Sequence, residues 1–267
     1  MTPPRKPAGA TKKAAGRQPA PRSRAAGAAT KKAAARKSAL PRASTASAAA
    51  DSRALAPLAD RRRKALAVLA ALRAEYPESR CSLEHGDGWQ LLVATILSAQ
   101  CTDARVNQVT PGLFRQFPTP ADFAAAPLAE IEEAIRSTGF FRNKAKSLQG
   151  AARALLEHHG GRLPTDIDEL VKVPGCGRKT ANVVLGEVYG SPAGVVVDTH
   201  VGRLSRKLGL TDQDDPVRAE RQLNECVPQA DWRDFGHLLI DHGRATCTAR
   251  APKCDDCALY RWCVVRA

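Results

Sequence analysis

The sequence lacks any apolar run long enough to cross a membrane, and no secretory signal is visible in it. Its longest uncharged apolar stretch, GWQLLVATILSAQCT at residues 88–102, falls short of the roughly 20 residues that a spanning helix needs. We therefore expect no membrane-bound part. Because disulfides belong mainly to exported proteins, we interpret the clustered cysteines among the eight as metal ligands.

Acidic residues are missing altogether from residues 1–50. Twelve of the 41 lysines and arginines lie in this segment, which leaves 29 basic and 27 acidic residues in 51–267. The net charge of +14 thus belongs almost entirely to the leader. The remainder of the chain must bind any nucleic acid through a local patch of charge.

Large apolar residues are also scarce in the leader, which consists mostly of Ala, Lys, Arg, Pro and Ser. Such a segment cannot bury enough surface to offset the entropy lost on ordering, so we expect residues 1–52 to be a disordered basic tail. Three roles stay open: a polycation that contacts phosphates, a targeting peptide, and an inert extension. Six prolines argue against the amphipathic helix of a targeting peptide, and we favour the first role.

Helical patterns dominate the sequence from about residue 55 onward, and the fold is expected to be all-α. Only GVVVD at 194–198 resembles a strand, and it is too short to build a sheet. Apolar spacing and helix-end signals predict helices within residues 60–77, 88–100, 128–139, 144–161, 165–173, 198–210, 215–227 and 231–243.

The stretch VPGCGRKTANVVLGEV, residues 173–188, predicts a tight turn that leads into an apolar helix. Gly175 and Gly177 let the backbone approach another chain closely, and the free N–H groups at the helix start form an anion site. Arg178 and Lys179 stand at this end of the helix, where the helix dipole disfavours cations. A bound phosphate would offset the field on Arg178, whereas an ordinary helix–helix turn explains the glycines but not the cations.

Lys179 has two possible roles in this turn. A nucleophilic amine must be unprotonated, and a helix N-terminus with a cationic neighbour favours the neutral form of an amine. The position therefore suits a lysine that forms a Schiff base. A surface lysine that contacts a phosphate fits the same residues equally well.

Asp198, in VVVDTHVGRLSRKLGL, immediately precedes a helical pattern and is suited to cap that helix. A carboxylate also stabilises the positive charge that develops on a sugar when a glycosidic bond breaks. Capping and catalysis are compatible in one residue.

Four cysteines form a C-x6-C-x2-C-x5-C pattern, namely Cys247, Cys254, Cys257 and Cys263. Four thiolates within such a short stretch can close around one metal centre. Zinc is the alternative to iron and sulfur, but structural zinc sites usually combine two short knuckles and this pattern contains one. The cysteines outside the pattern are expected to be buried thiols: Cys81, Cys101, Cys176 and Cys226.

Together these motifs resemble the endonuclease III family of bifunctional DNA glycosylases and abasic-site lyases, over roughly residues 60–267. VPGCGRKTANVVL is similar to the family's helix–hairpin–helix, VVVDTHVG to its VDTH signature, and the cysteine spacing to its [4Fe–4S] loop. The resemblance implies that Lys179 attacks C1′ of the damaged nucleotide and that Asp198 assists base loss and proton transfers. It also implies a mainly structural [4Fe–4S] cluster, and it gives His200 no more than a supporting role.

The resemblance extends to residues that reach the base. LSAQCTD is similar to the segment whose glutamine, here Gln100, fills the gap opposite the flipped nucleotide. STGFFRNKAKS is similar to the second wedge loop, with Phe140 or Phe141 inserted, and Asp103 would line the base pocket. The ordinary alternatives are a polar helix-end residue for Gln100 and core packing for the phenylalanines. The residues expected to contact DNA phosphates are Gly175, Gly177, Arg178, Arg250 and Lys253.

The resemblance also implies two helical lobes that flank a DNA cleft. Residues 53–81 would supply an N-terminal helix that packs with the cluster lobe, 82–197 a six-helix bundle with the hairpin near 165–187, and 198–267 the cluster lobe. The expected activity is removal of oxidised or ring-saturated pyrimidines from double-stranded DNA through a lysine Schiff base, followed by nicking through β-elimination. We expect a cytoplasmic, nucleoid-associated monomer.

Two other functions fit parts of the sequence. An adenine-mismatch glycosylase of the same superfamily shares the cluster and the aspartate, but it lacks the hairpin lysine. A catalytically idle iron–sulfur protein that binds DNA, with a histone-like tail, would retain the motifs without turnover.

Overall fold

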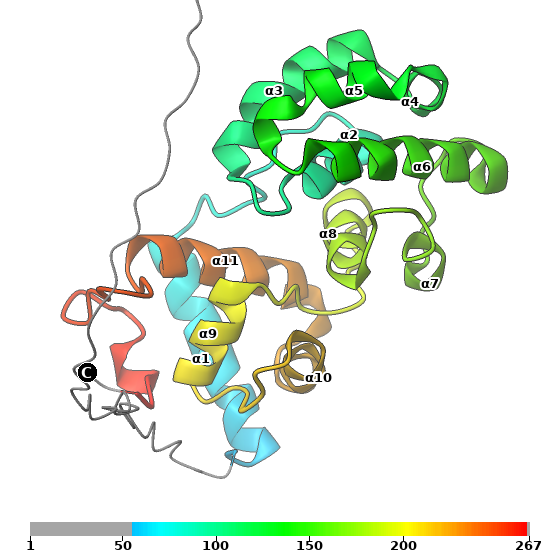
Figure 1. Cartoon of the computed structure of the whole chain (residues 1–267). Coiled ribbons are helices and arrows are strands. Elements are labelled where there is room, and N and C mark those ends of the chain that lie inside the picture. Colours follow the sequence, from blue (N-terminus) through cyan, green and yellow to red (C-terminus); the bar gives the residue numbers. More distant parts are fainter. Residues whose placement is uncertain (1–54, 266–267) are drawn as a thin grey trace, which may run out of the picture. The chain divides into compact units, whose positions relative to one another are not determined.

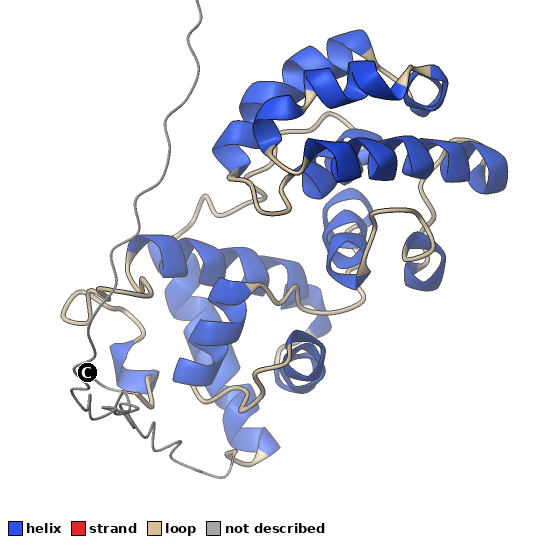
Figure 2. Ribbon diagram, viewed as in Figure 1, coloured by secondary structure: helices blue, strands red, loops and turns tan. Residues whose placement is uncertain are grey.

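The computed structural model describes residues 55–265 of the chain, so the basic tail expected at residues 1–52 lies outside the described residues. Residues 52–267 form one compact unit. The described part is helical throughout and contains no strand, which confirms the all-α fold (Figure 2). The stretch at 194–198 that resembled a strand is irregular.

Eleven α-helices and three 3-10 helices make up the described residues. The α-helices are α1 (Leu58–Glu75), α2 (Gly88–Leu97), α3 (Asp103–Gln116), α4 (Pro120–Ala125), α5 (Leu128–Ala134), α6 (Phe141–His159), α7 (Ile167–Leu170), α8 (Arg178–Tyr189), α9 (Thr199–Lys207), α10 (Pro216–Cys226) and α11 (Trp232–Ala245). The 3-10 helices are η1 (Arg136–Thr138), η2 (Gln229–Asp231) and η3 (Tyr260–Trp262).

The eight helices predicted from apolar spacing and the helix predicted after the 173–177 turn are all present, but α3 and α4 were missed. Helix α3 contains Pro111 in its interior, a residue that lowers helix propensity strongly. Packing compensates for this, because Val106, Thr110 and Leu113 on one face of α3 are buried. Tertiary contacts therefore stabilise α3 despite its low local helix propensity.

Two hydrophobic cores organise the helices. The two corresponding groups of helices are seen in Figure 1. The first core collects buried side chains between Leu83 and Leu185 and gathers α2 to α8; apart from the single-turn α7, these are six helices. The second core combines α1 with α9 to α11 and part of the C-terminal loop. The chain passes between the two groups twice, through residues 76–87 and 190–198.

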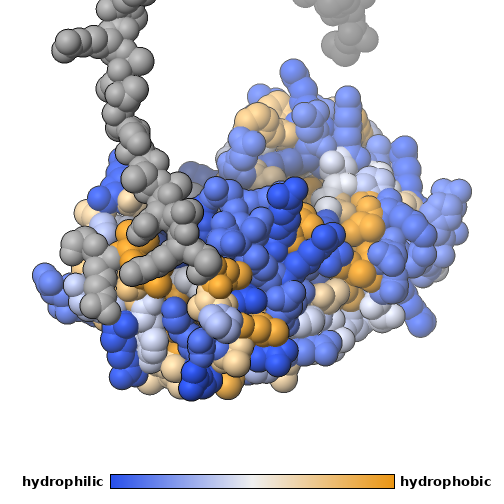
Figure 3. All heavy atoms as spheres, turned by 90° about the horizontal axis from the view of Figure 1, so that it is seen from below, coloured by the Kyte–Doolittle hydropathy of each residue, from blue (hydrophilic) through white to orange (hydrophobic). Residues whose placement is uncertain are grey.

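On the face shown in Figure 3, hydrophilic side chains cover most of the area and hydrophobic ones occur in separate patches. Within residues 55–265, no helix is both long enough and apolar enough to span a bilayer.

Candidate active site

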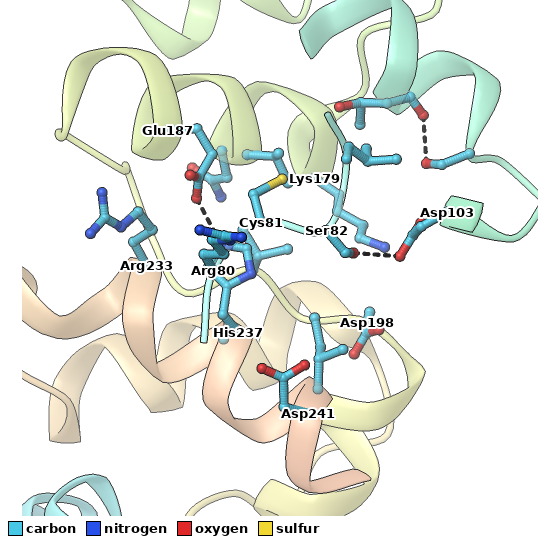
Figure 4. Close-up of a pocket in the computed structure, with 18 of the residues that line it drawn as sticks. Arg80, Cys81, Ser82, Asp103, Lys179, Glu187, Asp198, Arg233, His237 and Asp241 are labelled. Atoms are coloured by element: carbon cyan, nitrogen blue, oxygen red, sulfur yellow. Dashed lines mark hydrogen bonds and ion pairs between the residues drawn. The ribbon is translucent and has the colours of Figure 1, made fainter. Parts of the chain in front are cut away.

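A cleft with an empty volume of about 840 Å³, part of it open to solvent, is lined by residues of both groups of helices (Figure 4). The two crossing segments contribute Arg80, Cys81 and Ser82 on one side and Asp198 on the other. Lys179 and Asp198 both line this cleft and also line a second hollow beside it. The two residues expected to carry the chemistry are therefore brought to one place from different helices.

The turn before α8 requires glycine at one position. Gly175 has φ of 79°, and a Cβ there would lie 2.8 Å from Cβ of Ser147 on α6. Gly177 is the N-cap of α8 and provides no side-chain hydrogen bond, so the N–H groups at the start of α8 are not capped by a side chain. Such an end can bind an anion, as the hairpin interpretation expects.

Arg178 finds its partner inside the protein. Its Nε and Nη2 lie 3.2 and 2.9 Å from the two carboxylate oxygens of Glu220 on α10. Glu220 is buried, and it also accepts from Nδ2 of Asn182 at 3.3 Å. The cation at this helix start is thus balanced by Glu220, so a phosphate is not needed to explain it.

Asp198 is the N-cap of α9, and its Oδ1 accepts from the backbone N–H of Val201 at 2.8 Å. The carboxylate is half-buried and lines the cleft that also contains Lys179. The capping bond fixes the direction of the side chain, and the residue therefore serves the fold while it faces the cleft.

Asp103 begins α3 and lies in the same cleft near Lys179 (Figure 4). Its Oδ2 accepts from Oγ of Ser82 at 2.6 Å and from Nη2 of Arg244 on α11 at 2.7 Å. Burial would raise the pKa of this carboxyl, but the hydrogen bonds from Ser82 and Arg244 outweigh it and leave the pKa below its usual value, with a smaller contribution from Lys179.

Other residues of the cleft were not identified from the sequence. His237 on α11 lies 2.7 Å from Oε1 of Glu187 on α8, and both are largely buried. Asn182 is buried, and its Oδ1 has no hydrogen-bond partner among the described residues. A signal existed for Asn182, because it follows Lys179 by three residues and therefore shares its helix face.

The second hollow runs along the start of α9 and is lined by His200, Arg203 and Arg206 as well as by Lys179 and Asp198. His200 is half-buried, with Nδ1 3.5 Å from Nη2 of Arg203. These cations share the hollow with the carboxylates of Asp198 and Asp214, and Arg206 pairs with Asp214.

The two expected wedge loops share an unusual backbone. Gln100 and Phe140 are the two non-glycine residues with positive φ among the described residues, at 53° and 49°. Both are exposed, and 63% of Phe140 is accessible, an unusual state for a large apolar side chain. Phe141 instead packs partly against the first core, beneath Arg136 and Arg142. Residues held in sparsely populated conformations cluster at functional sites.

The cysteine pattern lies in the C-terminal loop, where all four thiols are free and half-buried. Burial raises the pKa of the Cys257 thiol, and the charges of Cys247 and Cys254 add to this effect, so these three are neighbours. Nη1 of Arg203 lies 3.6 Å from Sγ of Cys247, and Nε2 of His242 lies 3.4 Å from Sγ of Cys257. Arg250 and Lys253 are exposed on this loop.

The donor set of this loop is four thiols, the ligand set of a [4Fe–4S] cluster. An N–H group near a ligand sulfur, such as Nη1 of Arg203 beside Cys247, is the kind of outer contact that tunes such centres. Among residues 55–265, no three His, Cys, Asp or Glu side chains are arranged to hold a single metal ion. The donor chemistry therefore fits a cluster, while the loop presents no closed single-ion site.

The remaining cysteines differ in burial. Cys176 and Cys226 are buried in the first and second cores, as expected, and burial raises the pKa of Cys176 to about 12. Cys81 and Cys101 are only half-buried, so the expectation of buried thiols was wrong for these two. Cys81 lines the cleft, because it lies in the first crossing segment and not in a helix.

Residues 93–229 match the family model described as HhH-GPD superfamily base excision DNA repair protein. Endonuclease III of Synechocystis sp. is 52% identical over 209 residues, which cover 78% of this chain and 95% of that protein. The chain belongs to the endonuclease III family. It is thus a base-excision repair enzyme, a DNA glycosylase and abasic-site lyase.

Other members of the family agree with this assignment. Endonuclease III of Bacillus subtilis is 47% identical over 70% of this chain and 86% of that protein. The structure of a non-covalent endonuclease III–DNA complex superposes with a TM-score of 0.72 at 42% identity, over 76% of this chain and 95% of that one. A trapped covalent endonuclease III–DNA intermediate, an estranged-adenine complex, gives the same values.

Proposed function

We propose that this enzyme removes oxidised or ring-saturated pyrimidines from double-stranded DNA and then nicks the strand, with Lys179 as nucleophile and Asp198 as its carboxylate partner. The observation that carries the proposal is that both side chains line one cleft from different helices. DNA is the partner of the related proteins in the two complex structures. We further propose that the enzyme acts as a monomer on chromosomal DNA in the cytoplasm.

In the first step the neutral amine of Lys179 forms a bond to C1′ of the flipped nucleotide while the C1′–N glycosidic bond breaks. The base leaves with the bonding electron pair and takes up a proton. Positive charge develops on the sugar, and the carboxylate of Asp198 stabilises it because the hydrogen bond to Val201 holds it at the cleft.

In the second step the sugar ring opens and the Lys179 adduct becomes an iminium ion, the Schiff base. Loss of a proton from C2′ then expels the 3′ phosphate oxygen, which breaks the C3′–O bond. Water hydrolyses the Schiff base and restores the amine. Asp103 and Asp198 both line the cleft and are placed to accept or return protons.

The remaining predicted residues have roles in binding. Gln100 and Phe140 would fill the space left by the flipped nucleotide, while the free N–H groups after Gly175 and Gly177 would hold a phosphate. Arg178 also lies at this helix start, although its charge is shared with Glu220. His200 would support Asp198 from the second hollow.

Cys247, Cys254, Cys257 and Cys263 would hold a [4Fe–4S] cluster. The cluster would supply a rigid cross-link for the loop, so that the exposed side chains of Arg250 and Lys253 face DNA phosphates. We expect purified protein to be brown with absorbance near 400 nm, and we expect Cys257→Ser to lose this absorbance. Stoichiometric zinc and no iron would contradict the cluster assignment.

Borohydride reduction tests the lysine, because it converts the Schiff base to a stable amine bond between enzyme and DNA. With a duplex that contains one thymine glycol, the native protein should give a covalent adduct and Lys179→Gln none. Lys172→Gln is the matched control: Lys172 is an exposed lysine of the same hairpin that pairs with Glu169 and does not line the cleft. An adduct that survives Lys179→Gln would remove the nucleophile from this scheme.

Asp198 is tested on the same duplex. Asp198→Asn keeps an oxygen for the cap of α9 but removes the negative charge. Base release should fall by about 10²-fold or more, the usual size of one electrostatic contribution, while the unfolding midpoint changes little. Equal rates for Asp198→Asn and native protein would contradict its proposed role.

A further inference from the structure

Lys144 occupies an unusual position in the first turn of α6. Only 5% of it is exposed, and its Nζ donates to the carbonyl oxygens of Leu97 and Thr138, both at 2.8 Å. Leu97 is the last residue of α2 and Thr138 the last of η1. One buried ammonium therefore joins the carboxyl ends of two helical segments that are about forty residues apart in sequence.

Both segments lead directly into the strained residues described above. Gln100 follows Leu97 by three positions, and Phe140 follows Thr138 by two, with Gly139 at φ of 71° between. The same nitrogen is thus hydrogen-bonded to the backbone shortly before each of the two positive-φ residues. Side chains in such conformations persist only where their surroundings fix them firmly.

The stability of the core does not by itself account for a lysine at this place. Burying an ammonium group is costly unless it is paired, and the hydrogen bonds of Lys144 go to neutral carbonyl groups. Burial lowers the pKa of Lys144, and the opposing influence comes from the Cys101 thiol. An apolar side chain of similar length would fill the same space without this cost.

We infer that Lys144 is a positioning residue that couples the two loops, so that Gln100 and Phe140 enter DNA as one rigid pair. The inference rests on the wedge role proposed for these two residues. Without the ammonium, each loop would relax independently, and the energy to hold a nucleotide out of the stack would be lost in part.

Lys144→Met tests this, because methionine keeps an unbranched side chain but has no N–H donor. Gln149→Leu is the matched control. Gln149 is also buried on α6, and its Nε2 donates to the carbonyl oxygen of Ala126 at 2.8 Å. Ala126 follows α4 and does not lead into a wedge loop. Each variant is assayed on two substrates, a duplex with a ring-saturated pyrimidine and a single strand with an abasic site. The single strand has no duplex gap for the wedge residues to fill.

The duplex rate divided by the single-strand rate is the decisive quantity, because it does not depend on the fraction of folded enzyme. Lys144→Met should lower this ratio about tenfold, a part of the few kcal/mol that unstacking costs, and Gln149→Leu should leave it unchanged. Lys144→Gln, which retains N–H donors, should recover part of the loss. A ratio unchanged in Lys144→Met would overturn the inference and leave Lys144 as a structural residue.

The double variant Gln100→Ala with Phe140→Ala separates this inference from the proposed wedges. It should lower the same ratio, and adding Lys144→Met to it should produce little further change, since coupled residues are not additive. If the double variant keeps the native ratio, the wedge role itself fails. If it lowers the ratio while Lys144→Met does not, only the coupling fails.

Discussion

Glu220 offers a direct test of how the start of α8 is held. Its side chain is 8% exposed and contacts Arg178 through both oxygens, whereas the Arg178 side chain is 47% exposed. Glu220→Gln removes the charge but keeps nearly the same volume. The new NH₂ group would face either the guanidinium or Nδ2 of Asn182, and both of these are donors.

The expected cost follows from these contacts. Breaking a fully buried ion pair by removing one partner costs about 3–5 kcal/mol, but half-exposed Arg178 can turn to water. The buried N–H of Asn182 that loses its acceptor, together with the weakened contact to Arg178, should lower the free energy of unfolding by about 1–3 kcal/mol. A loss of about 2 kcal/mol would lower the Tm of a unit of this size by about 4–8 °C.

The effect on activity comes from the neighbour of Arg178. Lys179 is the next residue along α8, so a shift of this helix start moves its amine relative to Asp198. A displacement of about 1 Å can cost about 100-fold in rate. Single-turnover nicking of an abasic duplex measures this directly, and urea unfolding of the same preparation measures stability.

Glu225→Gln is the control on the same helix. Glu225 pairs with Arg61 at 3.2 Å, but its side chain is 55% exposed, and its loss should cost less than about 1 kcal/mol. The reasoning is refuted if Glu220→Gln matches Glu225→Gln in both stability and nicking rate. It is also refuted if Glu220→Gln unfolds at the native midpoint while Glu225→Gln does not.

Three further outcomes are expected. Gly175→Ala should destabilise the protein in urea by about 1–3 kcal/mol, because the new Cβ meets Ser147 at a positive φ; a native midpoint would contradict this. The lowered pKa of Asp103 stabilises the fold above about pH 4, and this contribution is lost as the pH falls through the folded value. Asp103→Asn should therefore be less stable at neutral pH and decline less in acid, and parallel acid curves would argue against it. Deletion of residues 1–50 should reduce the slope of log affinity against log salt by about 0.9 per lost phosphate contact, and an unchanged slope would show that the tail does not grip DNA.

The sequence predicted much of this fold because its local signals agree with the tertiary structure. The apolar spacing of α2 and α6 and the capping residue of α9 correspond directly to buried faces and hydrogen bonds. Helix α3 escaped notice, since the contacts that support Pro111 come from elsewhere in the chain.

The candidate site shows the same limit. Lys179, Asp198 and the cysteine pattern have local signatures and could be located in the sequence. Glu220 could not be located in this way, because its role depends on Arg178, which is 42 residues away in sequence. No pattern on α10 distinguishes it from other acidic residues. Lys144 likewise has no local signature, because its burial depends on carbonyl groups in two segments that are distant from each other in sequence.

Three of the polar contacts described above join helices of the first core to helices of the second: the ion pairs Arg178–Glu220 and Asp103–Arg244, and the contact between Glu187 and His237. Electrostatic interactions therefore contribute to holding the two groups of helices together. Salt screens these interactions, whereas it affects the packing inside either hydrophobic core much less. Concentrated salt should weaken the contacts between the two groups of helices before it unfolds any helix. Lys179 and Asp198 would then lose their alignment, although circular dichroism would still show a folded protein.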